Sequence, residues 1–258
     1  MSGSSEFAHR APMVFAPRQA TPKLLFVLLH DDSAAPEQMN GLVHALTEAF
    51  PASLVMLPYG PLSSSENSCH WFEQSGLLSS NYVQRVRLAL PNLIAQIRHL
   101  QARYGITGEH TALAGFGQGA TMALEASQAQ PDLAGRVLAF SGSYAQLPAQ
   151  ALPATTLHFL HGENDAIVPV SAMQETHSHL GDLQADSTLD IASQVGHELH
   201  DALINQAIVR LQTCIPLRSW RAAFSELPAQ DVGSLDDGGD TSLESGRLPG
   251  PPPSRRLH

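Results

Sequence analysis

The chain is poor in cysteine and in positive charge, and each shortage excludes a class of protein. Its 258 residues include only two cysteines, Cys69 and Cys214, which are too few for a disulfide framework or a four-cysteine zinc site. We therefore expect a cytoplasmic protein without a metal centre. With 14 basic residues against 24 acidic ones and a net charge of −10, the chain has no excess of positive charge for binding nucleic acid.

Long apolar runs are also missing. No run approaches the roughly 20 residues that a membrane-spanning helix needs, and the opening segment MSGSSEFAHRAP lacks the apolar stretch of a signal peptide. Hydrophobic residues nevertheless make up 43% of the chain and charged residues only 15%, a balance typical of a globular domain. The composition predicts a soluble α/β or α+β protein.

The composition changes along the chain and predicts three parts. We expect a flexible N-terminal segment at residues 1–22, one domain at residues 23–216 and a C-terminal extension at residues 217–258. After about residue 228 the extension is rich in Gly, Pro, Ser and Asp with little to bury, which predicts disorder. Four apolar residues at helical spacing precede that stretch and either close off the core or bind a partner: Leu217, Trp220, Phe224 and Leu227.

Short apolar runs alternate with helical patterns through the domain. The runs predict strands, and they lie at residues 23–30, 53–58, 111–115, 136–140, 156–162 and 187–192. Between two of them, residues 82–104 place apolar side chains at helical spacing, with Pro91 expected to kink the helix. This alternation predicts an α/β fold with a mainly parallel sheet and helices on both faces. In such sheets the chemistry lies at the carboxyl ends of the strands.

The third of these runs, residues 111–115, is followed by a glycine-rich turn. The sequence Gly115-Phe116-Gly117-Gln118-Gly119 then leads into a helical pattern. A strand, a tight turn and a helix form the context of the nucleophile elbow, G-x-S-x-G. Gly117 stands at the centre, where a nucleophile would be. The same glycines are also compatible with a phosphate-binding loop, although they do not match G-x-G-x-x-G, or with a turn that has no function.

Two later strand ends carry an acid and a base. Asp165 follows the strand at residues 156–162, and His197 lies between the last strand and a helix expected at about residues 201–213. The order elbow, Asp, His is that of a hydrolase triad on a parallel sheet. Taken alone, Asp165 could cap a helix and His197 could be a surface residue. The spacing of His197 and His200 does not support H-E-x-x-H zinc chemistry.

These motifs resemble those of the phospholipase/carboxylesterase family of α/β-hydrolases, which includes small bacterial esterases and relatives of acyl-protein thioesterases. The resemblance spans about residues 24–216 and is carried by GFGQGATMALE, LHGENDAIVP, VGHELH and HWF. It implies an α/β-hydrolase fold, no cofactor, and hydrolysis of small carboxylic esters or thioesters. It also assigns Asp165 as the acid, His197 as the base, the Gln118 N–H to the oxyanion hole, and Trp71 and Phe72 to the substrate pocket.

The chain departs from the family pattern at two places. Gly117 replaces the serine nucleophile, and the oxyanion motif His-Gly-x-Gly reads His30-Asp31-Asp32-Ser33. The Asp32 N–H would occupy the second donor position, beside carboxylates that repel a developing oxyanion. Two altered parts favour natural divergence over one deliberate replacement. We therefore expect a carboxylesterase-type protein that is impaired or inactive or, alternatively, a pseudo-hydrolase that binds an acyl ligand or a protein partner.

Overall fold

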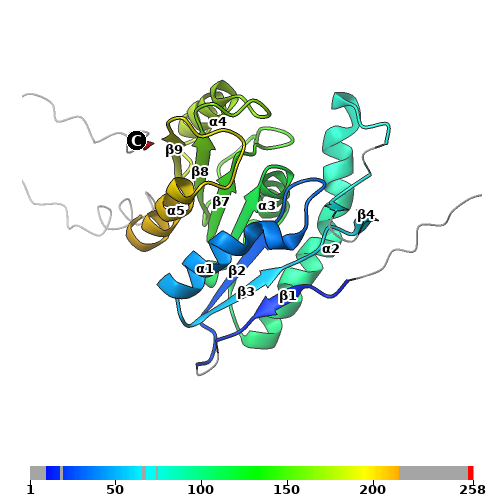
Figure 1. Cartoon of the computed structure of the whole chain (residues 1–258), viewed down its shortest axis with the longest axis vertical. Coiled ribbons are helices and arrows are strands. Elements are labelled where there is room, and N and C mark those ends of the chain that lie inside the picture. Colours follow the sequence, from blue (N-terminus) through cyan, green and yellow to red (C-terminus); the bar gives the residue numbers. More distant parts are fainter. Residues whose placement is uncertain (1–9, 18–19, 66–67, 74, 215–254, 258) are drawn as a thin grey trace, which may run out of the picture.

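The apolar runs form the strands of one twisted sheet that runs through the molecule (Figure 1). The computed structural model describes residues 10–17, 20–65, 68–73, 75–214 and 255–257. The strand order is β1-β3-β2-β6-β7-β8-β9-β10, and β1 alone runs antiparallel to its neighbour. A separate hairpin pairs β4 with β5. The predicted α/β class with a mainly parallel sheet is confirmed.

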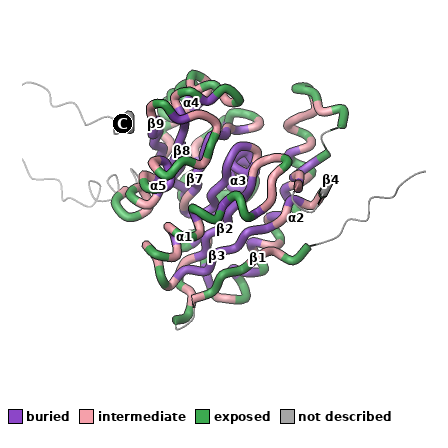
Figure 2. The backbone as a smooth tube through the Cα atoms, viewed as in Figure 1, coloured by how far each residue is buried: buried purple, intermediate pink, exposed green. Residues whose placement is uncertain are grey.

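Six strands, β2, β3, β6, β7, β8 and β9, agree closely with the six predicted runs, whereas no run was predicted at β1, β4, β5 or β10. Their bounds are β1 Met13–Phe15, β2 Leu24–Leu29, β3 Ser53–Leu57, β4 Leu62–Ser65, β5 Ser68–His70, β6 Thr111–Phe116, β7 Arg136–Phe140, β8 Thr156–Gly162, β9 Ser187–Ala192 and β10 Arg255–Leu257. Most positions of the central strands are buried (Figure 2). This explains why these runs are continuously apolar instead of alternating with polar residues.

Helices cover both faces of the sheet. Their bounds are α1 Asn40–Ala49, α2 Ser79–Tyr104, α3 Gln118–Ala129, α4 Val170–Asp182 and α5 Asp201–Thr213, with short 3-10 turns at Pro36–Met39 and Gly108–His110. One core cluster contains buried residues of α2, α3 and α4, and the other contains those of α1 and α5. Successive residues of β2 alternate between the two clusters, because neighbouring side chains of a strand point to opposite faces.

The strand order places a topological switch beside β2. The chain passes from β2 to β3 on one side and later returns to β6 on the other side. Leu29 at the end of β2 pairs with Gly115 near the end of β6. Loops that diverge after two such strands leave a crevice at their carboxyl ends, which is where ligands bind in open parallel sheets. The residues after β2 and β6 therefore belong to the candidate site.

The N-terminal boundary of the domain differs from the prediction. Residues 1–22 were expected to be flexible, but Met13–Phe15 form β1 and pair with Leu57, Met56 and Val55 of β3. That expectation is wrong for this segment because a three-residue edge strand is too short for its apolar pattern to stand out. At the other end, Arg255–Leu257 of the extension pairs in parallel with β9. The amphipathic segment at residues 217–227 lies outside the described residues.

The turn between β6 and α3 is built on close backbone contacts. A Cβ added to Gly119 would overlap the carbonyl groups of Leu29 and His30, and one added to Gly115 would overlap the backbone of Gly119. Glycine at these two positions therefore lets α3 begin directly against the ends of β2 and β6. Figure 2 shows α3 buried along most of its length, which is consistent with this close approach.

We predict that Gly119→Ala destabilises the protein, because its new methyl group has only rigid backbone to displace. The free energy of unfolding, measured by urea denaturation, should fall by about 1–3 kcal/mol, as in overpacked cores. Gly181→Ala is the matched control, since no atom lies within 4 Å of a Cβ in that exposed position of α4. It should leave stability unchanged or raise it by up to about 1 kcal/mol. Equal effects of the two substitutions would contradict the packing described for the elbow.

Candidate active site

Gly117 lies at the point where β6 turns into α3. Its backbone has φ 53° and ψ −116°, a combination that is strained for residues with a side chain. The Gly117 N–H donates to the Phe140 carbonyl at 2.9 Å, which ties the turn to the neighbouring strand β7. The sharp turn predicted between β6 and α3 is thus present, and its role as a nucleophile elbow stays a prediction. It carries no nucleophilic side chain.

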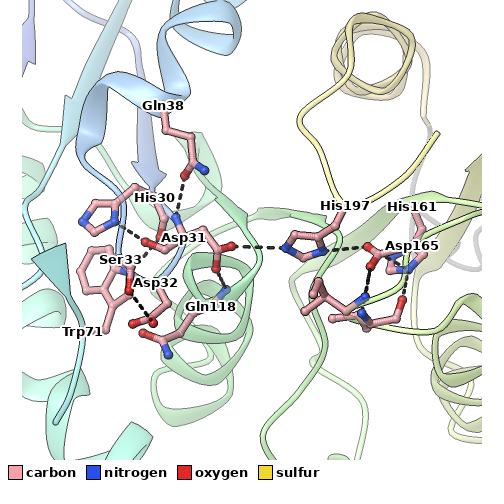
Figure 3. A network of polar contacts seen from close by, with 12 residues as sticks. His30, Asp31, Asp32, Ser33, Gln38, Trp71, Gln118, His161, Asp165 and His197 are labelled. Carbon is pink, nitrogen blue, oxygen red and sulfur yellow. Dashed lines mark hydrogen bonds and ion pairs between the residues drawn. The ribbon is translucent and has the colours of Figure 1, made fainter. Parts of the chain in front are cut away.

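Asp165 and His197 meet as the sequence predicts. They lie on the loops after β8 and β9, and the His197 Nδ1 is 2.9 Å from the Asp165 Oδ2 (Figure 3). The other oxygen of Asp165 accepts the backbone N–H groups of Ile167 and Val168, each at 2.9 Å. Burial alone would oppose ionisation of Asp165, but the hydrogen bonds from Val168, His197 and Ile167 outweigh it and lower the pKa of the carboxyl group. Asp165 is therefore a fixed anion that orients the imidazole.

A second histidine lies beside this pair. His161 is fully buried, and its Nε2–H donates to the Val168 carbonyl at 2.8 Å. It is also 3.6 Å from the Asp165 Oδ2. Burial lowers the pKa of His161, so the ring is neutral at ordinary pH. Of the two histidines, His197 is therefore the one that Asp165 can stabilise in its protonated form.

Asp31 is in direct contact with the site. The sequence had predicted only that its carboxylate would repel a developing oxyanion. Its Oδ1 accepts the Gln118 N–H at 2.6 Å, and its Oδ2 is 3.3 Å from the His197 Nε2. The Asp31 N–H donates in turn to the Gln38 Oε1 at 2.8 Å, which anchors the loop after β2. Figure 3 shows Asp31, His197 and Asp165 in a row, with the imidazole between the two carboxylates.

The Asp31 carboxylate lies where the elbow side chain would be. An ideal Cβ built on Gly117 would be less than 3.0 Å from both oxygens and from the Cγ of Asp31, a separation that real Cβ atoms essentially never show. The absence of a side chain at Gly117 and the presence of one at Asp31 are therefore two aspects of one arrangement. The only sequence signal for it was the pair of departures from the family motifs, which the linear order did not connect.

The other residues of the altered oxyanion motif turn away from His197. The Asp32 carboxylate contacts the His70 Nδ1 at 3.0 Å and accepts the Ser33 hydroxyl at 3.1 Å. Ser33 has φ 57°, a left-handed conformation that glycine adopts more readily. The expected contribution of the Asp32 N–H to an oxyanion hole stays a prediction.

Trp71 and Phe72, the predicted pocket residues, are packed in the core. Their exposed fractions are 3% and 5%. The Trp71 indole stacks on the His30 ring and donates to the His30 carbonyl at 2.9 Å. In this structure Trp71 therefore packs against His30 and stabilises the loop after β2. Direct contact of either aromatic side chain with a ligand stays a prediction.

His197 carries a proton more readily than an ordinary histidine. The hydrogen bond to Asp31 is the largest cause of its raised pKa, burial opposes it, and Asp165 adds a further increase. Both ring nitrogens face carboxylates, which only accept hydrogen bonds, so both contacts form fully only with the imidazolium. The two carboxylates therefore favour the imidazolium form of His197, whereas the base of a serine hydrolase must be neutral.

Comparison with known proteins agrees with this geometry. A family model described as Phospholipase/Carboxylesterase matches residues 16–215. The chain belongs to this family. Esterase YpfH of Escherichia coli (strain K12) is 34% identical over 202 residues, which cover 78% of this phospholipase/carboxylesterase chain and 87% of that protein. The resemblance stated from the motifs is thereby confirmed at the level of the family.

Solved structures of esterases share the fold. Esterase PE8 superposes with a TM-score of 0.71 at 27% identity and covers 78% of this chain and 97% of that chain. Acyl-protein thioesterase 2 of Zea mays has a TM-score of 0.61 at 16% identity, over 78% and 97% of the two chains. The second similarity supports the fold alone. The α/β-hydrolase fold predicted for this family member is confirmed.

Two features of the described residues bear on other functions. Among the helices in the described part of the chain, none is long and apolar enough to cross a membrane. Across the same ranges, no three His, Cys, Asp or Glu side chains are grouped so that they could hold a metal ion.

We predict that Asp31→Asn lowers the pKa of His197, because the variant removes the largest cause of its increase. A histidine with a raised folded-state pKa contributes stability that is complete below its unfolded pKa of about 6.5 and is lost as pH rises through the folded value. The wild-type protein should therefore lose more stability across that window than Asp31→Asn. An NMR titration of the His197 ring and urea denaturation at several pH values measure the two effects.

Asp32→Asn is the matched control, since Asp32 is not among the groups that raise the pKa of His197. It should leave the His197 titration in place. An unchanged titration in Asp31→Asn would contradict the ion pair between Asp31 and His197.

Proposed function

We propose that this carboxylesterase-family protein derives from a serine hydrolase of small carboxylic esters or thioesters and that this acyl-transfer activity is impaired or lost. The observation that carries the proposal is the overlap between the Asp31 carboxylate and the space of a side chain at position 117. Gly117 is the residue that replaces the nucleophile. Asp165 and His197 remain as the acid and the base.

Three requirements of ester hydrolysis are affected together. No hydroxyl is available to attack the acyl carbon; loss of a triad nucleophile costs on the order of 10⁶ in kcat, or about 8 kcal/mol of barrier. The Gln118 N–H, which would stabilise the oxyanion, already binds Asp31, and loss of such a donor costs roughly 10²–10³. The raised pKa of His197 favours its imidazolium form, which cannot accept a further proton. Each change alone would slow the reaction.

The cytoplasm is the compartment that we propose for this protein. Cys69 and Cys214 are both free, and Cys69 is buried. Unpaired thiols are typical of reducing compartments. The proposed substrate or ligand is accordingly a small ester or thioester of that compartment, as implied for the family, with no cofactor.

We predict that Gly117→Ser alone does not restore ester hydrolysis, because its side chain would have to displace the Asp31 carboxylate, which is held by the Gln118 N–H and contacts His197. The double variant Asp31→Gly/Gly117→Ser removes the overlap, frees the Gln118 N–H and releases His197 from its strongest partner. It should hydrolyse p-nitrophenyl acetate and butyrate at least about 10³-fold faster than the single variant. It should also be labelled by a fluorophosphonate at the new serine.

Two controls accompany these variants. His197→Ala in the double variant should remove the gained activity, since the serine then lacks its base. Asp31→Gly alone should stay inactive, since it opens the site without supplying a nucleophile. Fast ester turnover with covalent labelling of the unmodified protein would contradict the proposal, as would full rescue by Gly117→Ser alone.

A further inference from the structure

The two oxygens of the Asp31 carboxylate have different surroundings. Oδ1 is held by the Gln118 N–H at 2.6 Å, and Oδ2 faces the His197 Nε2 at 3.3 Å. The side chains of Asp31 and His197 remain 21% and 17% exposed, so the contact between them can be reached from solvent. The carboxylate thus has one oxygen held by a backbone N–H and one that faces the His197 ring (Figure 3).

We propose that Asp31 is a carboxylate nucleophile and that this site hydrolyses alkyl halides through a covalent ester of Asp31. The proposal goes beyond the loss of serine chemistry and shares one premise with it, the position of the Asp31 carboxylate at the elbow. Carboxylates serve as nucleophiles in enzymes when a covalent intermediate divides one difficult step into two easier ones.

The geometry favours displacement at a saturated carbon over attack on an acyl group. An acyl substrate needs a free donor for its own oxyanion, and the Gln118 N–H is already occupied. Displacement at an alkyl carbon creates no oxyanion. The oxyanion forms later, on Asp31 itself when its ester is hydrolysed, and it forms at Oδ1, which the Gln118 N–H already holds. The donor is therefore in place before the reaction begins.

In the first step, a lone pair of the Asp31 Oδ2 forms a bond to the alkyl carbon as the carbon–halogen bond breaks. The halide leaves with the bonding electrons, and a neutral alkyl ester of Asp31 remains. Since the hydrogen bond to Asp31 is the largest cause of the raised pKa of His197 and the charge of Asp31 adds to it, esterification of Asp31 weakens both and lets the imidazolium release a proton to solvent. His197 becomes neutral at the stage when a base is required, and Asp165 keeps the ring oriented.

In the second step, His197 takes a proton from water as the water oxygen bonds to the Cγ of Asp31. Electrons move onto Oδ1 and return as the Cγ–Oδ2 bond breaks. The departing alkoxide takes the proton from His197 and leaves as the alcohol. The new carboxylic acid protonates the imidazole and restores the ion pair. The sum is alkyl halide plus water giving alcohol, halide and one proton.

Bromide release tests the activity directly. The whole chain is incubated with primary bromoalkanes from bromoethane to bromohexane, and bromide is measured against a protein-free blank. We expect release above the blank by the wild-type protein and none by Asp31→Asn, whose amide preserves the size of the side chain and whose folding is checked by circular dichroism. Asp182→Asn, at an exposed position near the end of α4, is the matched control and should match the wild type.

Two mass-spectrometric readouts test the covalent step. In a single turnover with excess protein in heavy-oxygen water, the heavy atom should enter Asp31 and not the alcohol, because the alcohol oxygen comes from the carboxylate. His197→Gln should accumulate the ester, seen as the added mass of the alkyl group on the peptide that contains Asp31. Heavy oxygen in the alcohol would overturn the proposal. It would also be overturned if the wild type releases no bromide and the Asp31 peptide of His197→Gln stays unmodified.

The outcome is separable from that of the proposed function. If Asp31→Gly/Gly117→Ser gains esterase activity while the wild type releases no bromide, Asp31 only blocks the site and the nucleophile proposal is wrong. If bromide is released and the double variant gains nothing, the nucleophile proposal stands and the derivation from a serine esterase is wrong.

Discussion

The close approach of α3 to the ends of β2 and β6 is the constraint from which the site follows. Gly115 and Gly119 permit it, because any side chain at either position would meet backbone atoms. It places the Gln118 N–H within reach of the residue that follows His30, the histidine directly after β2. In this chain that residue is Asp31, so the Gln118 N–H, the predicted oxyanion donor, binds the Asp31 carboxylate instead.

The charges of the site then follow from that first contact. Asp31 and Asp165 flank His197, and together they raise the pKa of its ring. An imidazolium between two carboxylates is a poor base for activating a hydroxyl. Asp165 orients the His197 ring, and the contact with Asp31 adds to the preference of that ring for a proton.

Much of the fold and half of the site were predictable from local patterns. Runs such as residues 24–29 are apolar throughout because β2 is buried on both faces, and Asp165 and His197 were found because strand ends converge. The edge strand β1 was not predicted, because three residues are too few to show a pattern of apolar and polar residues. The contact of Asp31 with Gln118 and His197 was not predictable, because it joins loops that are distant in sequence and depends on side-chain direction. The resemblance to the family motif had instead predicted an oxyanion donor at Asp32, whose carboxylate contacts His70.

The overlap of positions 31 and 117 also couples the two residues in any change of this site. A side chain at position 117 and the present position of the Asp31 carboxylate cannot share the same space, so a residue larger than glycine at the elbow requires the Asp31 side chain to move. That movement would break the contacts of Asp31 with the Gln118 N–H and the His197 ring. A substitution at position 117 therefore acts on the hydrogen bonds of the site even though glycine itself has no side chain to form one.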